Sequence, residues 1–130
     1  MIYYKNLLLI DDDEDDHEFF LEAVREIDNT INCICLYDGE MALCMLREKK
    51  SLPDLIILDT NMPKTNGRQI LTELKSDPEL RDIPVIMYST LISERDNSEL
   101  QKLGAAHYLA KPSKFEDFLN ALNQILRRRW

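Results

Sequence analysis

The sequence lacks any apolar run near the roughly 20 residues that span a bilayer. The run Leu7 to Ile10, for example, is followed at once by acids. The N-terminus also lacks the ordered basic, apolar and cleavage segments of a signal peptide. Only three cysteines are present, Cys33, Cys35 and Cys44, and their spacing is not that of a metal or redox motif. These absences predict a reduced, cytoplasmic protein whose thiols are structural.

Basic residues are in the minority. The chain has 16 Lys and Arg against 24 Asp and Glu, which gives a formal net charge of -8. Much of this excess is local, because the segment Asp11 to Glu18 is acidic at all but one of its positions. Such a patch repels nucleic acid and anionic membranes and attracts cations. We therefore expect neither nucleic acid nor a membrane as a partner.

Internal repeats, linkers and low-complexity tracts are also missing, and 130 residues is close to the commonest size of one domain. Short apolar runs alternate with amphipathic stretches along the whole chain, which is typical of strands separated by helices in a parallel sheet. The predicted strands are Tyr4 to Ile10, Ile31 to Tyr37, Leu55 to Leu58, Val85 to Tyr88 and Ala106 to Ala110. Right-handed connections would place helices on both faces of this α/β sheet.

Polar side chains follow four of these predicted strands. Asp11 and Asp12 follow the first strand, Asp59 the third, Ser89 the fourth and Lys111 the fifth. Ligands of such sheets bind beyond the carboxyl ends of the strands, so we expect these side chains to meet in one site.

Carboxylates at neighbouring strand ends repel one another unless a cation lies between them. Asp11, Asp12 and Asp59 therefore predict a hard metal ion, and Mg²⁺ fits better than Ca²⁺ because it accepts few carboxylates together with waters and a phosphoryl oxygen. The metal would neutralise charge while a phosphoryl group moves onto Asp59. Lys111 would pair with the phosphoryl oxygens, and Ser89 would donate its hydroxyl to one of them.

The order of these motifs carries a resemblance to a known family. The acid pair, then Asp59-Thr60-Asn61-Met62-Pro63, then Ser89-Thr90 and finally Lys111-Pro112 resemble the response-regulator receiver domains of two-component signalling. The resemblance covers essentially the whole chain. It implies a flavodoxin-like (βα)5 fold with strand order 2-1-3-4-5, and a single stand-alone receiver domain over residues 1–130 without an effector domain.

The resemblance also implies roles for individual residues. Asp59 would be the phospho-acceptor, Asp12 a direct Mg²⁺ ligand, Asp11 a ligand through water, the Asn61 backbone carbonyl a third protein ligand, Ser89 the switch hydroxyl, Tyr108 the aromatic switch, Lys111 the phosphate-pairing lysine and Gly67 the glycine after the Met-Pro loop. Such a protein is not an enzyme in the usual sense, since it assists only its own phosphorylation and dephosphorylation.

The implied partners are proteins. A sensor histidine kinase or a phosphotransfer protein would donate the phosphoryl group, and a downstream protein target would contact the face of the fourth helix, fifth strand and fifth helix. Whether the chain forms a homodimer stays open. His17 is expected to be a solvated residue near a helix start, and His107 a residue of the fifth strand without a role.

Three alternatives have to be weighed. A small phosphatase of the haloacid-dehalogenase type would use Asp11 as nucleophile and Asp13 as general acid, but the chain lacks the further acidic pair that such enzymes carry after a later strand. A receiver fold could also serve as a docking module that is never phosphorylated. A calcium loop starting at Asp11 fails, because Asp16 stands where the sharp turn requires glycine.

Overall fold

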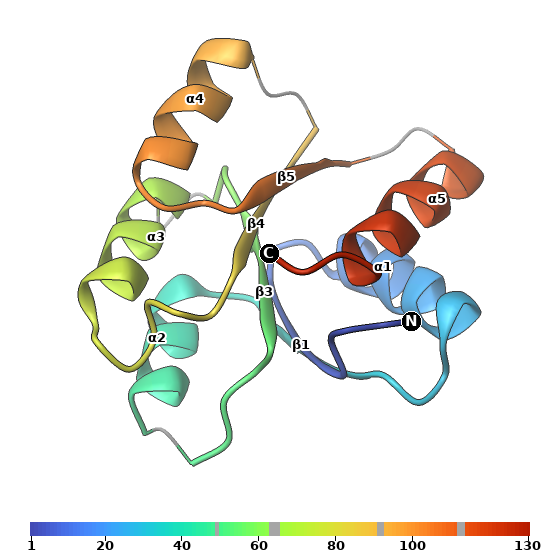
Figure 1. The fold of residues 1–130 in the computed structure, drawn as a ribbon, viewed down its shortest axis with the longest axis horizontal. Helices are drawn as coiled ribbons and strands as arrows, with labels where there is room; N and C mark the ends of the chain where they lie inside the picture. The colour runs from blue at the N-terminus through green and yellow to red at the C-terminus, as the bar shows by residue number, and fades with distance from the viewer. Residues whose placement is uncertain (49, 63–65, 91–92, 112–113) are drawn as a thin grey trace.

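The computed structural model describes residues 1–48, 50–62, 66–90, 93–111 and 114–130, so Pro63 and Pro112 of the predicted motifs lie outside it. Within these segments five strands alternate with five helices (Figure 1). The strands are β1 (Asn6–Ile10), β2 (Asn32–Leu36), β3 (Leu55–Asp59), β4 (Val85–Ser89) and β5 (His107–Ala110). The helices are α1 (Glu14–Ile27), α2 (Gly39–Glu48), α3 (Gly67–Ser76), α4 (Glu94–Lys102) and α5 (Phe115–Leu126).

All strand pairs are parallel, and the sheet has the order β2-β1-β3-β4-β5. The predicted fold class and strand order are therefore confirmed. Strands β3 and β4 are buried at every position, and β1 at every position after Asn6. A strand buried on both faces reads as a continuous apolar run. That is why short runs such as Leu55 to Leu58 located the strands to within one or two residues.

Helices cover both faces of the sheet. Figure 1 shows α1 and α5 packed on one side and α2, α3 and α4 on the other. Side chains of one strand alternate between the two layers: Leu7 and Leu9 belong to the core beneath α1 and α5, whereas Leu8 and Ile10 belong to the core beneath α2 and α3. Each fully buried leucine contributes about 1.5 to 3 kcal/mol of transfer free energy, so burial in the two cores stabilises the strands between the helical layers.

The start of α1 explains part of the acidic run. The Asp13 side chain caps the helix by accepting a hydrogen bond of 2.9 Å from the Asp15 backbone N–H. The acids Glu14, Asp15 and Asp16 occupy the first turn, where the positive end of the helix dipole favours them. At α4 the Ser93 hydroxyl accepts a hydrogen bond from the Asp96 N–H in the same way.

Trp130 packs back onto the domain. Its backbone N–H donates to the Tyr4 hydroxyl at 2.8 Å, and its indole N–H donates to the Ile125 carbonyl at 2.9 Å. The indole ring stacks on the ring of His107, with centroids 4.8 Å apart. Among the helices that the structure describes, none has the length and apolar character needed to cross a membrane.

Candidate functional site

The carboxyl ends of β1, β3 and β5 bring the predicted site residues together. Asp11 directly follows β1, and its backbone N–H donates to the Leu36 carbonyl at 3.0 Å. Asp59 is the last residue of β3. Lys111 directly follows β5, and its backbone N–H donates to the Ser89 carbonyl at 2.7 Å. Parallel pairing therefore fixes these residues at one edge of the sheet.

Three carboxylates form a compact cluster at this edge. One oxygen from each of Asp11, Asp12 and Asp59 lies within 4.8 Å of the other two. Asp11 and Asp59 are buried, whereas Asp12 is exposed. The cluster is thus open to solvent on the side of Asp12 and closed by the core on the side of Asp11.

Burial sets the electrostatics of the two inner acids. It raises the pKa of Asp11 to about 7, and the nearby Asp59 charge adds a smaller increase. A hydrogen bond of 3.0 Å from the Asp13 N–H and the proximity of Lys111 oppose this rise. Burial also raises the pKa of Asp59, against the opposing effects of the Asn61 N–H and Lys111. Both shifts show that the site disfavours its own negative charge.

One oxygen of the cluster has no directed partner. Asp11 Oδ2 is buried and accepts no hydrogen bond from the described part of the chain, although the Lys111 ammonium lies 3.0 Å away. A buried, under-coordinated carboxylate oxygen next to two further carboxylates matches the donor set of a hard divalent cation. Asp11, Asp12 and Asp59 could therefore hold such an ion.

The Lys111 ammonium lies among three acids. Its Nζ atom is 2.8 Å from Asp16 Oδ2, 3.0 Å from Asp11 Oδ2 and 3.3 Å from Asp59 Oδ2. Burial lowers the pKa of Lys111, but its close contacts with Asp16 and Asp11 and the charge of Asp59 outweigh this effect, so the net pKa is above its usual range. Lys111 is therefore fully charged in the site.

Asp16 is a site residue that the sequence did not reveal. It lies in the first turn of α1, and its carboxylate accepts a hydrogen bond of 2.8 Å from the Lys111 ammonium. In the sequence it looked like one of several acids that favour a helix start. The available signal was position: a residue early in α1 faces the end of β1 that it follows.

The remaining predicted residues lie on β4 and β5 or just after β3. The Asn61 backbone N–H donates to Asp59 Oδ1 at 3.1 Å, which places the Asn61 backbone beside the Asp59 carboxylate. Ser89 is buried at the end of β4. Tyr108 lies on β5 with 37% of its surface exposed, and its ring lies 5.3 Å from that of His107. Tyr108 is therefore a partly exposed residue of the edge strand β5.

Gly67 is required by a close backbone approach. A Cβ atom at this position would lie 2.7 Å from the Asp59 carbonyl oxygen and 2.9 Å from Thr60 Cα. Both neighbours are backbone atoms that cannot move aside without shifting the segment that carries Asp59. The predicted glycine after the Met-Pro loop therefore has a steric role next to the site.

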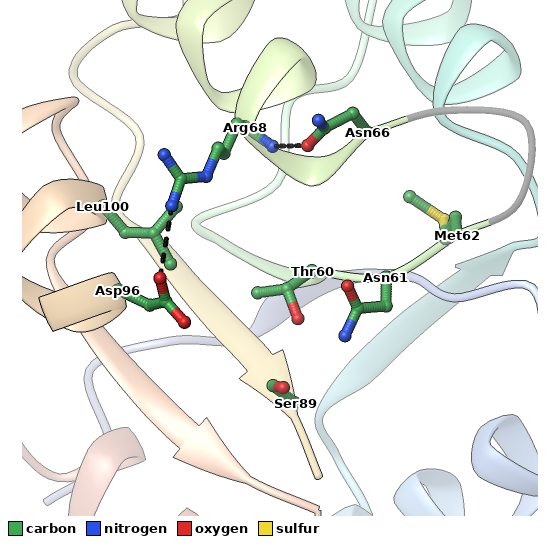
Figure 2. A pocket seen from close by; sticks show the side chains of 8 residues that line it. All are labelled: Thr60, Asn61, Met62, Asn66, Arg68, Ser89, Asp96 and Leu100. Atoms are coloured by element: carbon green, nitrogen blue, oxygen red, sulfur yellow. Dashed lines mark hydrogen bonds and ion pairs between the residues drawn. The ribbon is translucent and has the colours of Figure 1, made fainter. Parts of the chain in front are cut away.

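A pocket of about 340 Å³ adjoins the cluster between the end of β3, the start of α3 and α4. Figure 2 shows Arg68 reaching from α3 to Asp96 of α4, with Ser89 at the tip of β4 on the other side of the pocket. Arg68 forms ion pairs of 2.7 Å with Glu99 and 3.5 Å with Asp96. The pocket is lined by Thr60, Asn61, Met62, Asn66, Arg68, Ser89, Asp96 and Leu100.

The prediction for His17 was wrong. The side chain is buried, with 4% exposed, and its Nε2 atom lies 2.6 Å from the Asp11 carbonyl oxygen. Its ring packs against Tyr37 with centroids 4.3 Å apart. The cause is helical spacing: His17, Phe20 and Val24 share the inward face of α1. His17 thus supports the backbone of Asp11 from inside the fold.

Comparison with known proteins decides the family. The family model described as "Response regulator receiver domain" matches residues 7–123. The chain belongs to this family. It is 32% identical over 126 residues to "Response regulator Rcp1" of Synechocystis sp., covering 93% of this chain and 86% of that protein.

Solved structures of receiver domains agree with the fold. The phosphorylated cyanobacterial phytochrome response regulator RcpA has a TM-score of 0.84 and 33% identity, and the match covers 94% of this chain and 91% of that one. The Mn²⁺-bound form of Rcp1 has a TM-score of 0.81 and 30% identity, covering 96% and 97%. The chain is therefore a two-component response regulator, and receiver domains of this kind are signalling switches.

Proposed function

We propose that this receiver accepts a phosphoryl group on Asp59 from a histidine kinase or a phosphotransfer protein, with Mg²⁺ as the metal. The observation that carries the proposal is the convergence of a buried acceptor carboxylate, two further acids and one lysine at one edge of the sheet. The phosphorylated state would then be recognised by a downstream protein through the face formed by α4, β5 and α5.

The metal site follows from the donor set. Asp12, Asp59 and the Asn61 backbone carbonyl would bind the ion directly, and Asp11 would bind it through water. The Mn²⁺-bound structure of the relative Rcp1 supports a divalent ion at such a site. Bound Mg²⁺ would neutralise the phosphoryl oxygens during transfer.

The residues of the chain would perform the remaining chemistry. An Asp59 carboxylate oxygen forms a bond to phosphorus, and the phosphorus–nitrogen bond of the donor phosphohistidine breaks, with its electron pair returning to the imidazole. The Asn61 N–H, already bonded to Asp59 Oδ1, fixes the orientation of the acceptor. Lys111 Nζ, 3.3 Å from Asp59 Oδ2, would pair with one phosphoryl oxygen.

The switch would follow from the new charge. The Ser89 hydroxyl would move toward a phosphoryl oxygen, and Tyr108 would turn inward into the space that is vacated. The exposed ring of Tyr108 on β5 would then be buried, which changes the surface presented to the downstream protein. No further catalytic turnover is required of the chain.

Labelling with a small phosphodonor tests the proposal. Incubation with acetyl phosphate and Mg²⁺ should add one phosphoryl group to the wild-type protein, as measured by mass spectrometry. Asp59→Asn should abolish this labelling, because the amide is a far poorer nucleophile than the carboxylate. Chelation of Mg²⁺ should also abolish it while the circular dichroism spectrum stays unchanged.

The same experiment separates the alternatives. Labelling that persists in Asp59→Asn would refute the acceptor assignment. Turnover of a phosphomonoester that is lost in Asp11→Asn but kept in Asp59→Asn would indicate a phosphatase of the haloacid-dehalogenase type. A wild-type protein that is never labelled, with acetyl phosphate or with a phosphorylated kinase, would indicate a docking module.

A further inference from the structure

The shortest contact of the Lys111 ammonium is with Asp16, not with the phospho-acceptor. Nζ lies 2.8 Å from Asp16 Oδ2 and donates a hydrogen bond to it, whereas the distance to Asp59 Oδ2 is 3.3 Å. The Lys111 side chain is only 13% exposed, so its position is largely set by these acids. In the unphosphorylated site, Lys111 is therefore hydrogen-bonded to Asp16 of α1.

Asp16 and a phosphoryl group would compete for the same cation. An ammonium has three hydrogens to donate, and Nζ already lies within 3.3 Å of carboxylate oxygens of Asp11, Asp16 and Asp59. Asp11 is buried, whereas the Asp16 side chain is 28% exposed and can be rehydrated if it loses its partner. Asp16 is thus the acid that can release Lys111 at the smallest desolvation cost.

We propose that Asp16 is a positioning residue that restrains Lys111 in the unphosphorylated site and releases it to the arriving phosphoryl group. The inference rests on the proposed phosphorylation of Asp59. A phosphoryl group brings more negative charge and more acceptor oxygens than the single carboxylate of Asp16, so it draws the ammonium away. Every contact that Asp16 makes with Lys111 stabilises the resting state and so opposes phosphorylation.

The test compares two acids of one helical turn. Asp16→Asn removes the partner of Lys111, and Asp15→Asn removes the same charge from the adjacent exposed position. The second-order rate constant for labelling by acetyl phosphate with Mg²⁺ should rise about fivefold in Asp16→Asn, as expected for the loss of a partly exposed ion pair. It should change less than about twofold in Asp15→Asn, since an exposed charge is screened. Asp16→Glu should return the rate to near the wild-type value.

A second measurement examines the resting state without metal or phosphodonor. A double-mutant cycle with Asp16→Asn and Lys111→Met, followed by urea unfolding, isolates the interaction of the two side chains. We expect the pair to favour the folded state by about fivefold in the equilibrium constant. The matched cycle with Asp15→Asn and Lys111→Met should give no coupling.

The outcomes are distinct. Equal rate constants for Asp16→Asn and Asp15→Asn, a slower reaction of Asp16→Asn than of the wild type, or zero coupling in the Asp16 cycle would each overturn the inference while leaving Asp59 as the acceptor. A wild-type protein that is not labelled would instead overturn the proposed function, and the restraint on Lys111 would then have no phosphoryl group to oppose.

Discussion

Each acid of the site lies at a different depth, and its depth determines what its charge costs. Asp11 is fully buried, Asp59 nearly so, Asp16 is partly exposed and Asp12 faces solvent. The single ammonium of Lys111 compensates the inner acids only in part. The three carboxylates therefore favour a bound cation, and the stability of the metal-free protein should depend on the protonation of Asp11.

Stability without metal should depend on pH through Asp11. Its pKa is raised in the folded protein to about 7, mainly by burial, whereas an unfolded aspartate titrates near pH ~4. The folded state therefore binds this proton more tightly, and its contribution to stability is present below about pH 4 and lost as pH rises through about 7. Between pH ~5 and ~8 we expect a loss on the order of 2 kcal/mol.

Urea unfolding in chelator, followed by circular dichroism, measures this loss. Asp11→Asn has no such proton and should show a flatter dependence over the same range. Added Mg²⁺ should stabilise the wild type more at pH ~8 than at pH ~6, because protons and the metal compete for the same oxygens. A wild-type profile as flat as that of Asp11→Asn would contradict the assigned pKa.

Single residues of the site were predictable when they came at the end of a predicted strand. Asp11, Asp12, Asp59 and Lys111 each follow an apolar run, and the parallel topology then forces them together. Asp16 was not predictable in this way, because one acid among seven in a helix start carries no distinguishing signal. Its contact depends on the direction in which α1 leaves the sheet, and that direction is a property of packing.

Among the elements, the described residues next to the end of β3 and the start of α3 fix the position of Asp59. Thr60 continues the sheet by donating its N–H to the Tyr88 carbonyl at 3.1 Å. Asn66 caps α3 by accepting a hydrogen bond of 2.8 Å from the Arg68 N–H (Figure 2). Between them, Asn61 and Asn66 form an isolated antiparallel bridge. The backbone of Asp59 and Thr60 leaves no room for a side chain at Gly67.

Gly67→Ala should therefore impair the site as well as the fold. The added Cβ would overlap the Asp59 carbonyl at 2.7 Å, and relieving this overlap shifts Asp59. We expect a loss of about 1 to 3 kcal/mol in the free energy of unfolding and a reduced rate of labelling by acetyl phosphate. Urea unfolding and mass spectrometry measure the two effects.

Gly104→Ala is the matched control. Gly104 has φ of 114°, so alanine is strained there too, but the position is at the end of α4 and its closest neighbour is the flexible side chain of Lys75. It should lower stability and leave the labelling rate of the folded protein unchanged. Equal labelling rates for the two alanine variants would show that Gly67 has no special relation to Asp59.

The elements themselves were predicted well because their signals are local. Proline before β4, glycine after α4 and helical apolar spacing in α5 each mark a boundary. The starts of β1 and β2 were placed one or two residues too early, since Tyr4 and Ile31 are buried without belonging to a strand. Burial and ladder pairing are different properties, and apolar character reports only the first.

For the whole molecule, the packing of Trp130 joins residues at opposite ends of the sequence. It links Tyr4, near the start of β1, to His107 on the edge strand β5. The guanidinium of Arg128 lies 4.6 Å from the centre of the indole ring. Burial lowers the pKa of His107, and the charge of Arg128 lowers it further. The stack therefore favours the neutral imidazole.

Acid should weaken the packing of Trp130 against His107. The folded-state pKa of His107 is below its unfolded value near ~6.5, so its contribution to stability is present above that pH and is lost as pH falls through the folded-state pKa. Going from pH ~7.5 to ~5.5, the free energy of unfolding of the wild type should decrease relative to that of His107→Gln, because the two proteins share the opposite contribution of Asp11. Urea unfolding at both pH values measures the difference, and parallel profiles would argue against the stack as its source.

The order of motifs along the chain was sufficient to predict the family and the strand order of the sheet. It did not predict that Trp130 packs against Tyr4 and His107. A terminal aromatic residue has no periodic neighbours from which its packing can be inferred. Its partners, Tyr4 and His107, come from other units of the fold and become adjacent only after the sheet has formed.

The packing of Trp130 against His107 gives the protein an optical probe of its own. The chain contains one tryptophan, and its ring lies against His107, the neighbour of Tyr108 on β5. Indole emission responds to the rings and charges around it, so an inward turn of Tyr108 would alter the emission of Trp130. Conversion between the two states of this receiver would then be visible in real time, without a dye and without a partner.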